Sequence, residues 1–599
     1  MADTKRGADD GPLESLVVAD LGRGTSRAYL LEQVAGAFRF VAKAEGPTTG
    51  DRPYEDLTVG WQRLIAQLEW ESGRRLGERD GLLMPQQERG DGVDGLIVCA
   101  TTGEPLRVAV LEAGSSPVTG PLLEGLRRAY TRVFHAVAPS RSKDGAWGVT
   151  QAEALRRFRP DTVIVVIGAD KGGGAARVAQ VARQIGGAPT SSVTFSAASP
   201  RSSGVTRAVV VAEPNHQSAF AGAFGTKIDT RMVAPGEKSA GELASEIERE
   251  LLDAYRAQMQ TADFAEVTRD AVGVPMVRAQ AVDLVNRYIA RAFGRRVITI
   301  GIDDGAHVHW AAGDQTAVST LPHLDLGPMI TGLTAREVAD AARWLPFATT
   351  EDELISWVLN RAVRPWTAPH DPRDVLIDQA MARQVARRAL GDISRSYPLA
   401  LPGADLVIGG RWFARGADAG STALALLDSI DVVPDHGVLD LAIDQDGLMA
   451  VAGALGAIDP ALAADIFEYD GLTHLGSAVV IGGTTHDGDL ACRGELQYES
   501  GETVSFSVAS GQLEVLALRA GETATLVLRP ERRFSVGGHP SGKSVTLSDN
   551  RRIIGGAVGL IVDARGRSLG FGPAARPAKV KQWLDAVNGV VPTTARRSA

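Results

Sequence analysis

The sequence predicts a multidomain α/β protein that ends in an all-β domain. Between residues 94 and about 235, short and almost wholly apolar runs alternate with helical segments, as in a parallel sheet covered by helices on both faces. Apolar runs at 16–20, 296–301 and 406–408 end in or next to Asp or Gly. After about residue 474 the helical pattern stops and short alternating strands follow.

Length and composition exclude several classes of protein. The chain has 599 residues and a net charge of −9, so it is long enough for several domains and lacks the basic stripe that nucleic-acid binding requires. Its two cysteines, Cys99 and Cys492, lie far apart in the sequence, which argues against a disulfide framework or a thiolate metal site. No apolar run reaches the ~18–20 residues that span a bilayer, and no signal core opens the chain. We therefore expect a cytoplasmic protein with no nucleic-acid or membrane partner.

The first segment of the chain predicts the start of a core. Residues 1–14 are polar and predict a disordered tail. A strand over 16–20, a tight turn and a second strand from Ala28 follow. Residues 56–71 carry their apolar side chains on one stripe and predict a helix, and residues 73–93 predict a loop.

The remaining chain divides by texture. Within the α/β region we expect a helix over 121–137 and a strand over 192–196. The predicted divisions are a first core segment over 15–93, an inserted α/β domain over 94–237, a second core segment over 238–473, a C-terminal β domain (a small barrel or sandwich) over 474–575, and a helix and tail over 576–599.

The first motif that carries chemistry is the turn DLGRGTSR over residues 20–27. A strand ends in Asp20, and glycines then allow the backbone to approach an anion closely. Backbone amides and hydroxyls at Gly22, Gly24, Thr25 and Ser26 can donate to phosphate oxygens, and an Asp can hold Mg²⁺ through water. An ordinary β-hairpin, in which these are only turn residues, is the alternative.

The second motif repeats this arrangement. The apolar strand 296–301 leads into Asp303-Asp304-Gly305-Ala306, which would face the first turn across a cleft and clamp a triphosphate with its metal. A plain hairpin is again the alternative. His307 and His309 share a strand face and permit a metal site, but no further His or Cys ligand lies nearby.

Two glycine-rich segments follow other strands. The strand 406–408 ends in Gly409-Gly410, where a flat ring can lie against the backbone; a βα turn that needs small residues explains the same pattern. Residues 168–174 stand between a strand and a helix, but they match neither dinucleotide-binding nor P-loop spacing, so a βα turn competes with nucleotide binding there.

Taken in order, these motifs resemble the layout of the actin-like, hexokinase-like and Hsp70-like ATPase superfamily. More narrowly, the chain resembles the MutL (GlmL) family encoded beside glutamate mutase, which is unrelated to the mismatch-repair protein of similar name. The resemblance covers roughly 16–465 and is carried by the turn at 20–27, by 167–174, by 210–220 and above all by 405–463. It implies a two-lobed actin-like (ribonuclease H-like) ATPase core; the β-rich C-terminal region has no place in that core.

The resemblance also implies ligands and residue roles. ATP and Mg²⁺ would bind between the lobes, with Asp20 positioning the metal and the first turn holding phosphates. Asp303 would orient the attacking water, Gly305 and Ala306 would contact phosphate, and Gly409-Gly410 would lie behind the adenine. Such a mechanism rests on positioning and electrostatics.

The chain departs from the superfamily pattern at both turns. Arg23 and Gly24 stand where hydroxyl residues are common, and Arg27 stands where a Lys is often found. In the second turn, His307-Val308-His309 replaces the expected threonines. Without those hydroxyls at the γ-phosphate, we expect slow or absent hydrolysis.

By resemblance, the function is that of an ATP-binding, chaperone-like accessory protein of a cobalamin-dependent mutase. The sequence does not fix the oligomeric state. Two alternatives stand beside this function: a nucleotide-binding scaffold without turnover, and a small-molecule kinase of the sugar-kinase type, which would need an Asp base facing a hydroxyl.

Overall fold

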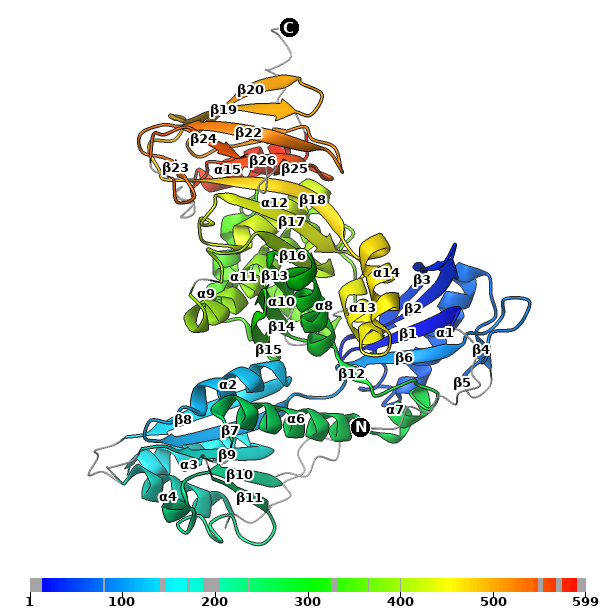
Figure 1. Ribbon diagram of the computed structural model, residues 1–599, viewed down its shortest axis with the longest axis vertical. Coiled ribbons are helices and arrows are strands. Elements are labelled where there is room, and N and C mark those ends of the chain that lie inside the picture. The colour runs from blue at the N-terminus through cyan, green and yellow to red at the C-terminus, as the bar shows by residue number, and fades with distance from the viewer. Residues whose placement is uncertain are drawn as a thin grey trace.

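The computed structural model has a mixed α/β fold with parallel, antiparallel and mixed sheets (Figure 1). The residues it describes are 13–78, 81–139, 146–169, 173–186, 205–234, 236, 238–324, 332–364, 366–398, 400–539, 541–547, 553–566 and 574–589. The predicted tails, the predicted strand at 192–196 and the centre of the 168–174 segment lie partly or wholly outside these ranges.

The first lobe is built on a five-stranded sheet in the order β12-β6-β1-β2-β3. β1 to β3 form an antiparallel meander, and β6 and β12 continue the sheet in parallel beside β1. The helix α1 (Leu57–Ser72) covers one face; the Asp56 side chain caps its start, and Gly73 ends it in the left-handed region. The strands are β1 (Ser15–Leu21), β2 (Thr25–Val34), β3 (Ala37–Pro47), β6 (Gly95–Ala100) and β12 (Met276–Val277), with a small hairpin of β4 (Gly77–Glu78) and β5 (Gly81–Leu82) at one end.

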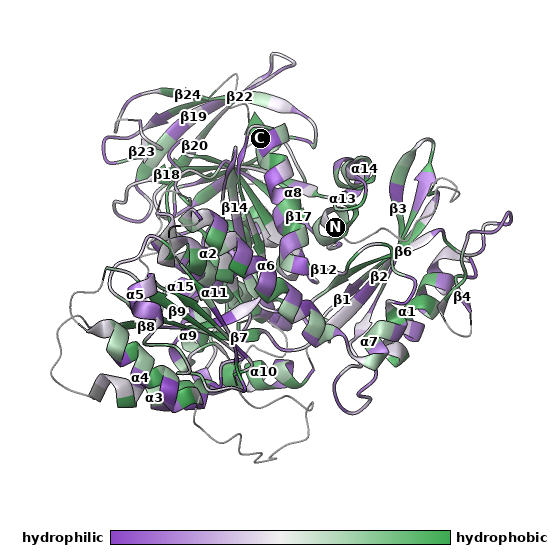
Figure 2. Cartoon of the chain, turned by 60° about the horizontal axis from the view of Figure 1, so that its bottom comes forward, coloured by the Kyte–Doolittle hydropathy of each residue, from purple (hydrophilic) through white to green (hydrophobic). Residues whose placement is uncertain are grey.

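The insertion is a separate, wholly parallel sheet in the order β11-β10-β9-β7-β8. Alternate residues of its strands pack against α2 and α6 on one face and against α3 and α4 on the other, and the strands β7 and β9 are mainly hydrophobic in Figure 2. Its elements are β7 (Leu106–Ala113), α2 (Thr119–Arg128), β8 (Thr131–Ala138), α3 (Ala146–Phe158), β9 (Thr162–Ile167), α4 (Gly174–Gly186), β10 (Arg207–Val211), α5 (Pro214–Gln217), β11 (Asp229–Val233) and α6 (Ala240–Met259).

The boundaries of the insertion differ from the predicted ones. β6 belongs to the first lobe, and α6 packs on α2 within the insertion, so the insertion spans β7 to α6 rather than residues 94–237. The helix predicted over 121–137 is also wrong in its second half, because the chain turns after α2 and forms β8. The short helix α7 (Ala262–Val267) then leads back to β12.

The second lobe repeats the strand order of the first. β13, β14 and β15 form an antiparallel meander, and β16 and then β17 continue in parallel beside β13. The helices α8 and α13 pack on one face of this sheet, and α11 and α12 pack on the other. The elements are α8 (Arg278–Ala292), β13 (Arg296–Gly301), β14 (Ala306–Ala312), β15 (Gln315–Leu321), α9 (Ala335–Asp340), η2 (Ala341–Trp344), α10 (Glu351–Val363), α11 (Pro372–Ser396), β16 (Leu406–Gly410), η3 (Arg411–Phe413), α12 (Ala419–Ser429), β17 (Val438–Asp444), α13 (Leu448–Gly456) and α14 (Pro460–Asp470).

The C-terminal strands are not a detached unit. β18 pairs with β17, β26 pairs with β18, and β21 pairs with β26, so the sheet of the second lobe runs across the predicted boundary at 474. A second small sheet, in the order β20-β19-β22-β24 with β25 beside β22, packs against β18 and β26. The elements are β18 (Thr473–Gly482), β19 (Leu490–Tyr498), β20 (Thr503–Ala509), β21 (Leu513–Leu516), β22 (Thr523–Pro530), β23 (Ser535–Val536), β24 (Val545–Leu547), β25 (Ile553–Ile554), β26 (Gly559–Asp563) and α15 (Arg576–Val587).

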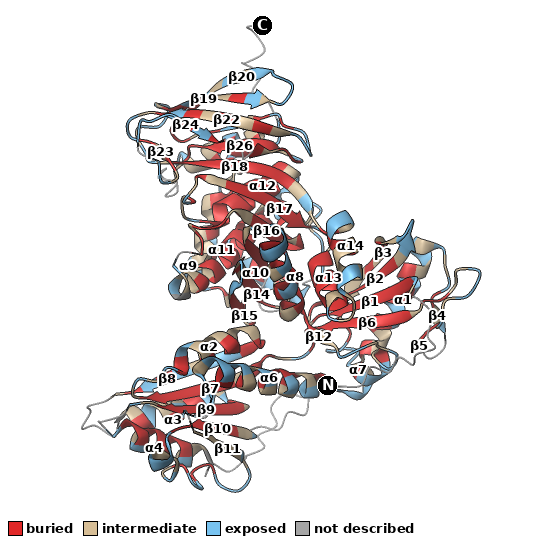
Figure 3. Ribbon diagram, in the orientation of Figure 1, coloured by how far each residue is buried: buried red, intermediate tan, exposed pale blue. Residues whose placement is uncertain are grey.

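A buried ionic network strengthens this join. Asp428 in α12 binds Arg383 of α11 at 3.1 Å and Arg565 beyond β26 at 2.8 Å, and Arg565 also binds Asp563 at 2.9 Å. All four side chains are almost fully buried. Figure 3 shows the same continuity, since the buried strands extend from β13 through β26 while β20 at the far edge is exposed.

The two lobes meet through shared helices. α13 packs against the sheets of both lobes, and α14 holds β3 through Asp470, which accepts from the Arg39 side chain at 2.7 Å and the Phe40 amide at 2.9 Å. Because both lobes carry the same meander, this packing aims the β1–β2 turn and the β13–β14 turn at each other.

Candidate functional site

The two predicted turns are in direct contact. The backbone amides of Arg23 and Gly24 donate to Asp304 Oδ1 at 2.9 and 3.4 Å. Gly22 permits this approach, because a Cβ there would lie 2.5 Å from Asp304 Oδ2 and 2.4 Å from the Thr25 carbonyl. The sequence therefore placed the two turns opposite each other correctly, although the contact is closer than the cleft it suggested.

The second turn has a backbone that suits this contact. Asp304 has φ +53° and Gly305 has φ +113°, both in the left-handed region. The insertion reaches the same turn, because the Tyr130 hydroxyl donates to the Asp304 carbonyl at 2.9 Å. Arg23 also reaches toward the insertion and binds Glu104 at 2.7 Å.

Asp20 is buried and fully bonded. Its Oδ1 accepts from Arg278 Nε at 2.9 Å and Arg278 Nη2 at 2.6 Å, and its Oδ2 accepts from Arg27 Nη1 at 2.8 Å. The side chain of Asp20 is 1% exposed, and those of Arg27 and Arg278 are 2% and 5% exposed. Arg278 is the first residue of α8 and also binds Asp304, so it holds a carboxylate of each turn.

Asp303 lies on the other side of Arg27. Its Oδ1 accepts from Arg27 at 3.0 Å, from Arg411 Nε at 3.2 Å and from the Trp412 indole at 2.8 Å. Burial would raise the pKa of Asp303, but the charges of Arg411 and Arg27 outweigh it and hold that pKa well below its usual range. Asp303 is therefore an anion that is already paired, and it is a poor proton acceptor in this arrangement.

Glu45 of β3 completes the cluster. It binds Arg411 at 2.6 Å and lies 3.5 Å from Arg27 Nε. Burial raises the pKa of Glu45, but Arg411 and Arg27 lower it by more, so it too is an anion at neutral pH. The site is thus a buried ionic cluster of four carboxylates, Asp20, Glu45, Asp303 and Asp304, bridged by three guanidinium groups, Arg27, Arg278 and Arg411.

A further positive charge borders this cluster. The guanidinium groups of Arg361, Arg411 and Arg415 lie 5.2, 5.4 and 4.8 Å from the centre of the Trp412 ring. Burial and then the charges of Arg411 and Arg361 lower the pKa of Arg415 to about 10, so it stays protonated at neutral pH. Within the described part of the chain, Arg415 has no carboxylate within 4 Å, and its Nη1 has no acceptor.

The predicted hydroxyls and glycines lie at or near the turns. Thr25 and Ser26 are buried at the start of β2, and Ala306 is buried at the start of β14. Gly409 pairs with Ile300 and Ile443, and a Cβ there would lie 2.4 Å from Leu426 of α12. Close packing thus explains that glycine, and the contact of Gly409-Gly410 with adenine stays a prediction.

His307 and His309 form a buried pair. Their rings are joined by a hydrogen bond of 3.0 Å between His309 Nε2 and His307 Nδ1. Burial, and then the neighbouring His309, lower the pKa of His307 to about 3, so it is neutral at pH 7. No group of three or more His, Cys, Asp or Glu residues suited to a metal ion occurs in the described ranges.

The hydrogen bonds that Asp20 and Asp304 already accept decide whether Mg²⁺ fits at Asp20. Both Asp20 oxygens and both Asp304 oxygens already accept hydrogen bonds from guanidinium or backbone N–H groups. A cation at Asp20 would have to displace Arg278. The buried Arg278 guanidinium would then lie beside the cation without a carboxylate partner. The residues present in this arrangement do not fit a bound Mg²⁺.

A carboxylate outside the predicted set lies beside Gly410. Asp444 ends β17, and burial raises its pKa to about 7. It resembles the base that a kinase would need, but its two oxygens accept from the Leu448 and Met449 amides at 2.7 and 3.1 Å and so cap α13. The kinase alternative, which needs an Asp base facing a hydroxyl, therefore stays a prediction.

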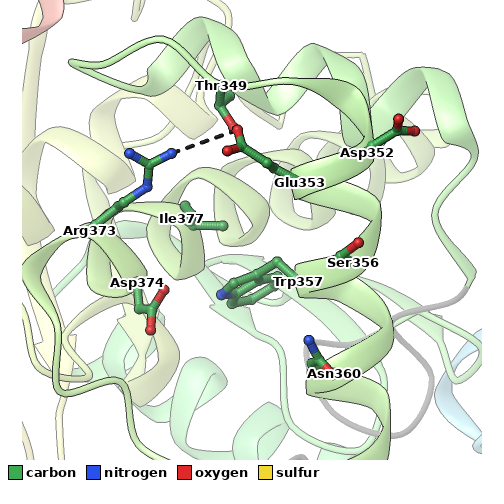
Figure 4. Close-up of a pocket in the computed structure, with 9 residues that line it drawn as sticks. All are labelled: Thr349, Asp352, Glu353, Ser356, Trp357, Asn360, Arg373, Asp374 and Ile377. Carbon is green, nitrogen blue, oxygen red and sulfur yellow. Dashed lines mark hydrogen bonds and ion pairs between the residues drawn. The ribbon is translucent and has the colours of Figure 1, made fainter.

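A surface groove lies away from these turns. It is about 440 Å³ in volume and runs between α10 and α11, with Trp357 and Ile377 at its base and Asp352, Asp374 and Arg373 around it (Figure 4). Arg373 lies 3.7 Å from Glu353. None of the residues of the two turns lines it.

This chain has only weak similarity to known proteins. The sequence matches no protein-family model and no curated protein. Among solved structures, it is similar to a ROK family glucokinase from Streptomyces griseus with glucose and AMPPNP bound (11% identity, 74% of this chain, 97% of that chain, TM-score 0.27). It is also similar to a carbohydrate kinase from Novosphingobium aromaticivorans (12%, 78%, 94%, 0.26) and to an acetate kinase from Porphyromonas gingivalis (9%, 74%, 100%, 0.24).

The described residues also bear on membranes. No helix among them is both long and apolar enough to cross a bilayer.

Proposed function

We propose that this protein binds an adenosine nucleotide where the β1–β2 and β13–β14 turns meet. The observation that carries the proposal is the contact between two equivalent turns of two lobes with the same strand order, joined through Asp304 and the amides of Arg23 and Gly24. Backbone amides of glycine-rich turns can bind phosphates, and in this proposal a phosphate replaces Asp304 Oδ1 as the acceptor of the Arg23 and Gly24 amides. A ligand held by both turns would set the distance between the lobes.

We propose further that the nucleotide acts as a switch and is hydrolysed slowly or not at all. Asp303, the residue expected to orient water, is held by three donors. The turn also lacks the hydroxyls that would help at the γ-phosphate, and each missing transition-state hydrogen bond costs on the order of 10²–10³ in rate. A nucleotide-binding scaffold without turnover is the limiting case of the same proposal.

The partner in this proposal follows from the sequence alone. The resemblance to the MutL (GlmL) family suggests a cobalamin-dependent mutase of the glutamate mutase type, with chaperone-like reactivation as the role. Co-purification of this chain with the mutase, retained with ADP and released with ATP or the reverse, would support that partner. Equal retention with either nucleotide, or none, would contradict it.

Calorimetry with ADP and ATP tests the binding proposal, because a ligand that binds only the folded state also raises the melting temperature. Hydrogen exchange should show protection of amides at 22–25 and 303–306 when nucleotide is added. Binding without protection there would move the site elsewhere, and no binding would refute the proposal.

Single-turnover hydrolysis tests the switch. We expect little phosphate release, and no difference between the wild type, Asp303→Asn and the matched control Asp314→Asn, whose side chain is 89% exposed on the opposite turn of β14. Rapid hydrolysis that is lost only in Asp303→Asn would instead establish a working ATPase.

A further inference from the structure

We propose that this site takes phosphate groups without a divalent cation, because Arg278 and Arg27 occupy the place at Asp20 that a metal would need. The inference rests on the proposed nucleotide binding and concerns how the phosphates are held. In this inference Arg27 and Arg278 supply the positive charge that a metal ion would supply at a carboxylate without arginine partners.

Hydrogen bonds saturate the Asp20 carboxylate. Three N–H groups of two arginines saturate its carboxylate at 2.6–2.9 Å, and all three side chains are at least 95% buried. Guanidinium groups stay charged at all accessible pH values. The Asp20 carboxylate is therefore paired with two guanidinium groups in this arrangement.

The fold also leaves space for Arg278 beside the first turn. A Cβ on Gly22 would lie 3.1 Å from Arg278 Nη2, so the absence of a side chain at position 22 leaves space for the guanidinium. The strand β12 pairs with β6 and delivers Arg278 as the first residue of α8. The arginine is thus built into the turn contact by the sheet of the first lobe.

Several guanidinium N–H donors next to the turns lack an acceptor in the described part of the chain. Arg27 Nε and Arg411 Nη2 are buried and have no hydrogen-bond acceptor within the ranges described, although Arg27 Nε lies 3.5 Å from Glu45. Arg415 adds a positive charge with a buried Nη1 that also lacks an acceptor. Unsatisfied buried donors on charged groups are costly, and phosphate oxygens satisfy guanidinium groups in pairs.

Calorimetry with ADP decides the claim, carried out once with EDTA and once with excess Mg²⁺. We expect dissociation constants that differ by less than about tenfold. Binding that is weaker in EDTA by about tenfold or more would overturn the inference and leave the proposed function intact. No binding in either buffer would refute the proposed function and, with it, the phosphate component of this inference.

Electron paramagnetic resonance of Mn²⁺ tests the cation component without nucleotide. The wild type should leave the free Mn²⁺ signal unchanged. A site that binds one Mn²⁺ per chain and disappears in Asp20→Asn would overturn the inference, whether or not nucleotide binds.

Variants assign the roles of the arginines. Arg278→Gln frees Asp20 Oδ1 and Asp304 Oδ2, and we expect it to gain a Mn²⁺ site. The control Arg291→Gln, which removes an exposed ion pair with Asp314 from the same helix, should not gain one. A folded Arg278→Gln protein without Mn²⁺ affinity would contradict the inference that Arg278 occupies the place of a metal at Asp20. If this variant does not fold, the wild-type Mn²⁺ measurement decides whether Asp20 binds a cation. Arg415→Gln should weaken ADP binding about tenfold or more in EDTA, because it removes a charged hydrogen bond to phosphate. Unchanged binding would remove Arg415 from the site.

Discussion

Removing the charge of Asp20 should destabilise the protein far more than removing a surface charge. Asp20→Asn leaves Arg27 and Arg278, which are 2% and 5% exposed, without the carboxylate that both contact. Breaking a buried ion pair by deleting one partner costs about 3–5 kcal/mol. For a cooperative unit of about 150–250 residues, each kcal/mol shifts the melting temperature by about 2–4 °C. The two packed lobes are larger than this, so we expect a loss toward or below the lower end of about 6–20 °C.

A double-mutant cycle makes this prediction specific to the pair. Arg278→Gln alone should also be strongly destabilising, because it leaves Asp20 and Asp304 under-bonded. The double variant Asp20→Asn/Arg278→Gln removes both charges, and its loss should be smaller than the sum of the single losses by about 1–3 kcal/mol.

Differential scanning fluorimetry, supported by urea unfolding followed by circular dichroism, measures these changes. The control is Asp314→Asn, which removes an exposed pair with Arg291 and should change stability by less than about 0.5 kcal/mol. An Asp20→Asn protein as stable as this control, or strictly additive single losses, would show that the ion cluster does not hold the two turns together.

Three other changes have expected outcomes. Gly22→Ala places a methyl group 2.4 Å from the Thr25 carbonyl and should lower the free energy of unfolding by about 1–3 kcal/mol, measured by thermal unfolding. The control Gly120→Ala in α2, whose methyl group meets nothing within 4 Å, should be neutral or slightly stabilising. Equal effects of the two changes would contradict the close approach at Gly22. The pKa of His307 is lowered from 6.5 to about 3, so the folded state binds fewer protons than the unfolded chain between these values and stability must fall as pH decreases. Between pH 6.5 and 5 this loss is about 2 kcal/mol, and melting curves of His307→Gln should be flatter across that range; parallel curves would assign the loss to other groups. Truncation after residue 470 removes Arg565 and also removes β18, which pairs with the edge of β17. The truncated protein should therefore be insoluble, or aggregated in size-exclusion chromatography. A monomeric, cooperatively melting product would instead support an independent C-terminal domain.

The sequence predicted the turns because their signals are local. An apolar strand that stops at an Asp followed by glycines identifies a turn from a few residues, and the repetition of that pattern near residue 303 predicted that two turns would face each other. The contact from the Arg23 amide to Asp304 confirms their proximity. The parallel sheet of the insertion was predictable for the same reason, since fully buried strands show as continuous apolar runs.

The partners of the turns were not predictable in this way. Arg278 stands in an ordinary helical sequence, 258 residues from Asp20, and nothing near it indicates where that helix begins in space. Arg411 and Trp412 follow Gly409-Gly410 directly, and their N–H groups could have been interpreted as hydrogen-bond donors to a carboxylate such as Asp303. Arg27, which the resemblance marked only as a replacement for Lys, bonds Asp20 and Asp303 at once.

The C-terminal strands show a different limit. Alternating polarity correctly predicted β-structure after residue 474, but the same alternation arises in a free sheet and in strands that extend a larger one. Two features place them in the second lobe: the pairing of β18 with β17, and the buried carboxylate of Asp428 that Arg565 reaches. Both depend on contacts between distant segments, which strand periodicity does not encode.

The insertion is connected to the two turns at two places: where the chain returns to the first lobe through β12, and at Tyr130. The chain leaves the first sheet after β6 and returns at β12, and the next residue along is Arg278, which binds Asp20 and Asp304. The insertion also touches the second turn directly through Tyr130. A partner that shifts the insertion against the first lobe would therefore pull on β12 and on the Asp304 carbonyl together, and both displacements act on the same buried ion cluster. Because a buried guanidinium that loses its carboxylate is strongly destabilising, we expect the pairs of Arg278 with Asp20 and Asp304 to oppose such a movement.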